Sequence, residues 1–122
     1  MYIKENETRT LPEIDFEEIN GILKLSGKSI SNEVPEYYKP ILDYVREIVK
    51  SLNKLEVTID FEYFNTKTAR ELIRLFDIIK DVKDLTINWY YEEDDESMLE
   101  AGKDYEDITG IKFNFIKKLI KK

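Results

Sequence analysis

Hydrophobic and polar residues alternate one by one in several short stretches of the chain. This two-residue period is typical of strands that bury one face and leave the other in contact with water or a partner. Asn20-Gly21 lies between the first two stretches and is the strongest short signal for a hairpin turn. The predicted strands cover residues 10–16, 22–25, 55–63, 85–91 and 112–116.

Three other segments repeat apolar residues every three to four positions, which predicts helices with one buried side. The first predicted helix covers about residues 35–52, and Ser31 and Asn32 are its candidate N-caps. The second lies between two of the predicted strands. The third follows the acidic run 92–96, which suits a helix N-terminus, and stops at Gly110.

The element order β-β-α-β-α-β-α-β predicts an α/β fold with a mixed, mainly parallel sheet after the opening hairpin. Two of the inner strands alternate cleanly instead of being apolar on both faces, so we expect the helices to lie mostly on one face. The length of 122 residues corresponds to one domain over residues 1–122. A domain of this size buries a core without disulfides or metals.

The composition excludes several kinds of chemistry. The chain contains neither Cys nor His, which removes the usual general base, the usual zinc ligands and Ser-His or Cys-His nucleophiles. Its net charge of −7 disfavours nucleic acid and anionic membranes as partners. The pairs Lys117-Lys118 and Lys121-Lys122 run against this average and are interpreted as a solubilising end. No glycine-rich phosphate loop or catalytic motif appears, so we expect neither an enzyme nor a cofactor.

The N-terminus lacks the apolar core of a signal peptide, and no apolar run approaches the roughly 20 residues that span a bilayer. The sequence therefore predicts a cytoplasmic protein that does not interact with a membrane.

The corner after the strand at 55–63 is the first candidate site. Asn65 is a suitable cap for the second helix, which places Thr66, Lys67 and Thr68 in its first turn. A phosphate on a hydroxyl there would be favoured by the helix dipole and the free backbone N–H groups, and Lys67 and Arg70 would add charge-assisted contacts. On local chemistry alone, ordinary capping is the preferred interpretation of Asn65 and Thr66, because most Asn-Thr pairs at helix starts are only caps.

The second candidate site is a polar and aromatic face formed by the two neighbouring strands at 55–63 and 85–91. If these strands are adjacent, Asn88 and Tyr90 project beside Asp60 and Glu62, and Tyr63 lies near their ends. Such a face suits a protein partner. A plain solvent-exposed face remains equally compatible with the pattern.

The acidic run 92–96 supplies the hard oxygen ligands that Mg²⁺ and Ca²⁺ prefer. It lacks the spaced ligands and the turn glycine of an EF-hand loop, so a solvated helix start is the preferred interpretation and no metal is expected. A small carboxylate-based or metal-dependent enzyme that uses Asp60, Glu62 and this run is a third, disfavoured function class.

Three segments, residues 20–27, 62–66 and 88–102, resemble the SiaC family of bacterial regulatory phosphoproteins. The runs Tyr-Phe-Asn-Thr at 63–66 and Asn-Trp-Tyr-Tyr-Glu at 88–92 are its more distinctive parts. The resemblance implies a STAS-like fold. It also implies partner switching with a Ser/Thr kinase and a PP2C-type phosphatase, in which the unphosphorylated form activates a GGDEF diguanylate cyclase. Cyclic di-GMP would then promote biofilm formation or aggregation.

The resemblance also implies a phosphoacceptor, because the family's acceptor threonine follows an asparagine and Asn65-Thr66 matches that pattern. Small hydroxyl residues often come next in the family, whereas Lys67 follows here and Thr68 is the next hydroxyl. Thr68 is therefore a rival acceptor. An anti-sigma-factor antagonist that acts on an anti-sigma kinase is the alternative function.

Overall fold

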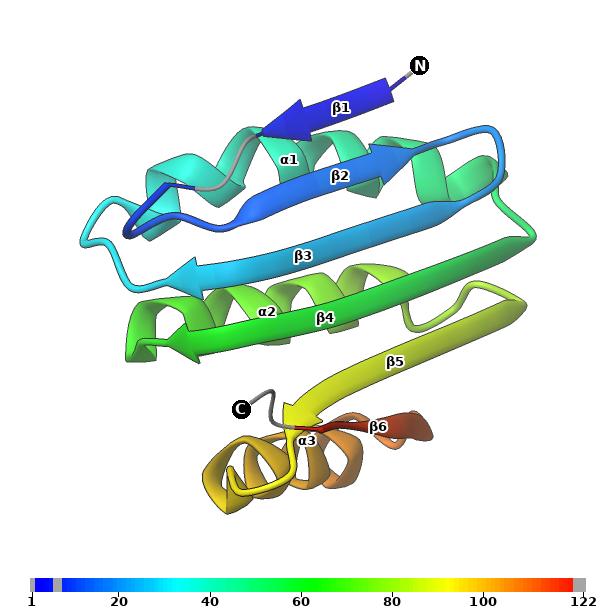
Figure 1. Ribbon diagram of the computed structural model, residues 1–122. Helices are drawn as coiled ribbons and strands as arrows, with labels where there is room; N and C mark the ends of the chain where they lie inside the picture. Colours follow the sequence, from blue (N-terminus) through cyan, green and yellow to red (C-terminus); the bar gives the residue numbers. More distant parts are fainter. Residues whose placement is uncertain (1, 6–7, 120–122) are drawn as a thin grey trace.

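The computed structural model describes residues 2–5 and 8–119, and these form a six-stranded sheet with three α-helices (Figure 1). The strands are β1 (Tyr2–Glu5), β2 (Glu13–Glu17), β3 (Ile22–Ser29), β4 (Lys54–Phe64), β5 (Asp84–Glu92) and β6 (Phe113–Lys118). The helices are α1 (Val34–Ile48), a short 3₁₀ turn η1 (Val49–Ser51), α2 (Thr66–Ile79) and α3 (Glu96–Thr109). Lys121 and Lys122 of the basic end lie outside the described residues.

The strands follow one another across the sheet in the same order as along the chain, β1-β2-β3-β4-β5-β6. The pairs from β1 to β3 are antiparallel, and those from β3 to β6 are parallel. Because parallel crossovers are right-handed, connections that all step in one direction place every helix on the same face. Figure 1 shows α1 and α2 together behind the sheet. The predicted mixed sheet with helices on one face is confirmed.

The core fills the space between this face and the helices. The inward side chains of β4 belong to Leu55, Val57, Ile59 and Phe61, all at most 3% exposed. Trp89 of β5 is fully buried, and its indole N–H donates to the Met98 carbonyl in the first turn of α3 at 2.9 Å. The buried Trp89 ring therefore has a hydrogen-bond partner for its indole N–H, which is its only polar group.

The start of the chain and the ends of α1 differ from the prediction. β1 is an additional edge strand, which pairs Tyr2 with Glu17 and is too short to show a period of its own. Glu33, not Ser31 or Asn32, is the N-cap of α1, and no side chain caps this helix. Ser31 instead accepts a hydrogen bond from the Glu33 N–H through its Oγ, at 2.9 Å.

A bulge near the end of β4 interrupts the strand, although apolar and polar residues alternate there without a break in the sequence. Gly27 pairs with Phe61, but the next residue, Lys28, pairs with Tyr63, so Glu62 is an extra residue in β4. The bulge turns Tyr63 away from the core and leaves it 61% exposed. Phe64 then packs edge-on against Trp89, with ring centroids 6.1 Å apart.

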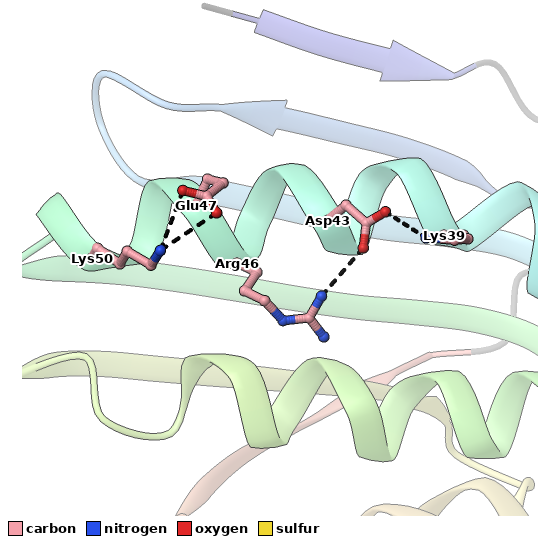
Figure 2. A network of polar contacts seen from close by, with 5 residues as sticks. All are labelled: Lys39, Asp43, Arg46, Glu47 and Lys50. Carbon is pink, nitrogen blue, oxygen red and sulfur yellow. Dashed lines mark hydrogen bonds and ion pairs between the residues drawn. The ribbon is translucent and has the colours of Figure 1, made fainter.

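The outer face of α1 carries charged side chains spaced three or four residues apart (Figure 2). Asp43 accepts from Lys39 at 2.8 Å and from Arg46 at 3.2 Å, and Glu47 pairs with Lys50 at 3.3 Å. All of these groups are at least half exposed, so each pair contributes little to stability. Within the described ranges, no helix has the length and apolar character needed to cross a membrane.

Candidate functional site

The corner between β4 and α2 is fixed by Asn65, which is the N-cap as predicted. Its Oδ1 accepts hydrogen bonds from the Thr68 backbone N–H and the Thr68 hydroxyl, both at 2.9 Å. Its own backbone N–H donates to the Ser29 carbonyl at 3.0 Å, and its Nδ2 donates to the Ser31 carbonyl at 3.3 Å. Asn65 thereby joins the start of α2 to the end of β3 through its backbone, and to the segment after β3 through its side chain.

Thr66 is the first residue of α2, and its side chain is exposed. The N–H groups of a first helical turn have no partner within the helix, and they give this end a partial positive charge. Lys67 and Arg70 are also exposed, and the Lys67 ammonium donates to the Asn32 carbonyl at 3.2 Å. Thr66 therefore presents an accessible hydroxyl beside donors and cations.

Thr68 differs from Thr66 in that it is fully buried. Its Oγ1 lies 2.7 Å from both the carbonyl oxygen and the Oγ of Ser29, and the Ser29 Oγ lies 2.9 Å from the Tyr38 hydroxyl. Burial raises the pKa of Tyr38, so this phenol stays neutral. In the folded chain the Thr68 hydroxyl is a member of an internal network and is closed to an enzyme.

This buried network of Ser29, Tyr38, Asn65 and Thr68 is not among the features predicted from the sequence. One signal was present: Tyr38 occupies an apolar position of the helical period, and a buried tyrosine needs a partner for its hydroxyl. Its partner Ser29 is distant from Thr68 in sequence, and only the parallel pairing of β3 with β4 brings the two together.

The open face of the sheet holds three of the predicted partner-binding residues. Asp60 forms an ion pair with Lys118 of β6. Asn88 is only 9% exposed, because its Nδ2 donates to Glu56 at 2.9 Å and its Oδ1 accepts from Asn114 at 3.1 Å. Tyr90, opposite Ile116 in the register, is partly exposed. Asn88 is thus engaged within the sheet face, whereas Tyr90 is accessible from it.

Glu62 and Tyr63, the other two predicted partner-binding residues, are exposed at the bulge, directly before the corner that carries Thr66. The structure therefore brings them next to the candidate phosphorylation site. Asp60, Asn88 and Tyr90 lie further back along the sheet.

The carboxylates of the acidic run 92–96 do not converge on a common point that could hold a metal ion. Glu92 ends β5 opposite Lys118, and Asp95 caps α3 by accepting from the Met98 N–H at 3.0 Å. In residues 2–5 and 8–119, no three Asp or Glu side chains converge in a way that could hold a metal ion.

Two tyrosines, Tyr37 in a partly buried position and Tyr105 in a buried one, predict a response of the fold to alkaline pH. Burial raises the pKa of Tyr37 and Tyr105 from 10.0 to about 12, and their hydroxyls donate to the carbonyls of Pro12 at 2.7 Å and Ala69 at 3.0 Å. Since the folded-state pKa lies above the unfolded value, this contribution to stability is complete below pH 10 and is lost as the pH rises through 12. We expect absorbance titration to show delayed tyrosinate formation in the native chain relative to the chain in denaturant. Tyr37→Phe and Tyr105→Phe should each remove part of the delay.

A six-stranded mixed sheet covered by helices on one face defines a small α/β domain. The family model for SiaC family regulatory phosphoproteins matches residues 5–118, and the chain belongs to this family. The resemblance inferred from the sequence is therefore confirmed. No curated protein matches the chain.

Solved structures share the fold. Apo-SiaC from Pseudomonas aeruginosa aligns with a TM-score of 0.85 at 17% identity, over 95% of this chain and 98% of that one. The diguanylate cyclase SiaD in complex with its activator SiaC, from the same organism, contains a chain that aligns with a TM-score of 0.88, also at 17% identity. That alignment covers 95% of this chain and 99% of the other. At this identity the likeness is one of fold.

Proposed function

We propose that the unphosphorylated chain binds and activates a GGDEF diguanylate cyclase, and that phosphorylation of Thr66 ends this interaction. Membership of the SiaC family and a fold shared with the activator of a cyclase support the cyclase as the target. The proposal assigns the reversible modification to a Ser/Thr kinase and a PP2C-type phosphatase in the cytoplasm. The chain itself acts by binding and not by catalysis.

The proposed site is Thr66 and not Thr68 because only the Thr66 side chain is accessible. Thr66 is exposed, whereas Thr68 is fully buried and bonded to Ser29 and Asn65. A kinase must reach the acceptor hydroxyl, and Thr66, the first residue of α2, is exposed to solvent in the folded chain. The rival acceptor Thr68 would require the network at the helix start to open.

A phosphate on Thr66 would act as a switch through its charge and hydration. It adds about −1.5 to −2 charges, held by the first N–H groups of α2 and by Lys67. A partner that packs against the neutral hydroxyl would have to strip water from this dianion, which is costly without a matching cation. Glu62, exposed just before the corner, adds to the local negative charge. The phosphorylated surface would therefore reject that partner.

The modification itself can be mapped directly. We expect incubation with a Ser/Thr kinase from the same host to add one phosphate, which peptide mass spectrometry places on Thr66. Thr66→Ala should abolish the modification, and Thr68→Ser should preserve it at residue 66. A phosphate found on residue 68 in the wild-type chain would contradict the site.

The effect of the charge on binding is the second part of the test. We expect Thr66→Ala to bind and activate the host's GGDEF protein like the wild type, whereas Thr66→Glu should weaken binding about tenfold or more. Calorimetry and cyclic di-GMP production would measure the two effects. Ser51→Glu places the same charge before the opposite end of β4 and should leave binding unchanged. Binding to an anti-sigma factor, with no effect on any cyclase, would favour the alternative function.

A further inference from the structure

A groove of about 370 Å³ lies between the end of β4 and the first turns of α3. Figure 1 shows the end of β4 and the starts of α2 and α3 at the same end of the sheet. We propose that this groove docks an apolar side chain of the cyclase that is flanked by Lys or Arg. The inference rests on the proposed function and names the chemistry of the contact. The groove is lined by Glu62, Tyr63, Phe64, Asp95, Ser97, Met98 and Ala101.

The walls of the groove are held in place before any partner arrives. The Met98 carbonyl accepts from the Trp89 indole at 2.9 Å, and the Met98 N–H donates to Asp95 at 3.0 Å. Phe64 packs edge-on against the same indole. The small side chain of Ala101 leaves room between α3 and β4. A preformed apolar hollow binds without the entropy cost of ordering its walls.

Tyr63, an exposed aromatic residue at the groove, is typical of protein–protein interfaces. The residue is 61% exposed because the bulge in β4 turns it outward. Tyrosine beside a desolvated hollow is among the residues that dominate binding energies in protein interfaces. Thr66 begins α2 three positions after Tyr63, so a protein seated in the groove also comes near the exposed Thr66 side chain.

The rim of the groove is acidic. Glu62 and Asp95 line it, and an adjoining hollow of about 80 Å³ adds Glu92. Neither hollow is lined by Lys or Arg, as far as the described residues go. In that part of the chain, no ion pair joins a cation to any of these three carboxylates. Charge complementarity therefore selects Lys or Arg on the side of the apolar group that faces these three carboxylates. The side that faces Thr66 meets the exposed Lys67 and Arg70 and is expected to carry no cation.

Two variants of the full chain test the groove against the purified cyclase. Ala101→Leu fills the hollow with an apolar group and should weaken binding about tenfold. The double variant Glu62→Gln with Asp95→Asn removes two charges while Asn keeps the helix cap, and it should weaken binding similarly and reduce its dependence on salt. Glu100→Gln, an exposed charge on α3 that does not line the groove, is the matched control and should bind like the wild type.

A second experiment does not depend on the cyclase. A synthetic helical peptide with a leucine face bordered by arginines is titrated into the ¹⁵N-labelled chain, beside a twin that carries glutamate in place of arginine. We expect the arginine peptide to shift the amide signals of Tyr63, Met98 and Ala101 and to bind about tenfold more tightly than its twin.

The outcomes separate the two proposals. Failure of the wild type to bind the cyclase overturns the proposed function. The peptide titration would still show whether the groove prefers an apolar group flanked by basic residues. Wild-type binding that both groove variants retain, with their folds intact by circular dichroism, overturns the inference. Equal binding of the two peptides, or shifts confined to other surfaces, overturns it as well.

Discussion

Replacement of Gly21 by alanine is expected to lower the free energy of unfolding by about 2–5 kcal/mol. Gly21 has φ of 65°, which costs an L-residue about 1–2 kcal/mol. A Cβ there would also lie 2.4 Å from the Lys54 carbonyl oxygen, a backbone atom that no side-chain rotation can move away. Relieving such overpacking adds about 1–3 kcal/mol. The close approach exists because the Gly21 carbonyl accepts from the Glu56 N–H at 2.7 Å, where β3 meets β4.

Gly110 is the matched control for this prediction. It has φ of 73°, but a Cβ there meets nothing within 4 Å. Gly110→Ala should therefore cost only the conformational part, about 1–2 kcal/mol. Urea unfolding monitored by circular dichroism measures both variants. Equal losses for the two would show that the contact with Lys54 contributes nothing.

Replacement of Thr68 by valine is expected to cost about 2–4 kcal/mol. Valine keeps the shape but removes the hydroxyl that lies within hydrogen-bond distance of Ser29 Oγ, the Ser29 carbonyl and Asn65. Each lost hydrogen bond contributes about 0.5–1.5 kcal/mol, and buried groups left without a partner add to the cost. The result would establish Thr68 as a structural residue of the corner.

Thr68→Ser is the control, since it restores the hydroxyl and should recover most of the stability. Urea unfolding again provides the measurement. Peptide mapping after kinase treatment distinguishes this structural role from that of an acceptor. A Thr68→Val chain as stable as the wild type would contradict the role of the network.

The elements were predictable where a single local signal determined them. Clean alternation located β4 and β5, and Asn20-Gly21 marked the hairpin. Its loop covers residues 18–21 and ends at Gly21, which has a positive φ, instead of being a two-residue turn. The cap at Asn65 and the stop at Gly110 followed from residue type alone. Such signals act over a few residues, so one sequence is enough to detect them.

What the sequence did not reveal depends on contacts between distant segments. β1 owes its conformation to the edge of β2, and the bulge at Glu62 arises in the register between β3 and β4. Continuous alternation does not predict this bulge, to which Tyr63 owes its exposure.

Contacts between distant segments also determine the candidate site. Residue types identified two hydroxyls at one helix start, but only the position of Ser29 distinguishes the exposed Thr66 from the buried Thr68. The groove beside Tyr63 also escaped prediction, because β4 and α3 line it from segments far apart in the chain.

The order of strands across the sheet also bears on how the chain can fold while it is being synthesised. From β2 onward, each strand that leaves the ribosome finds its neighbour on one side already made, since no strand is inserted between two earlier ones. Domains are produced from the N-terminus, and unpaired strand edges are a source of aggregation. At every stage the growing sheet therefore exposes only the most recent strand and the first one. The last strand, β6, completes the enclosure of Trp89 only when nearly the whole chain is present.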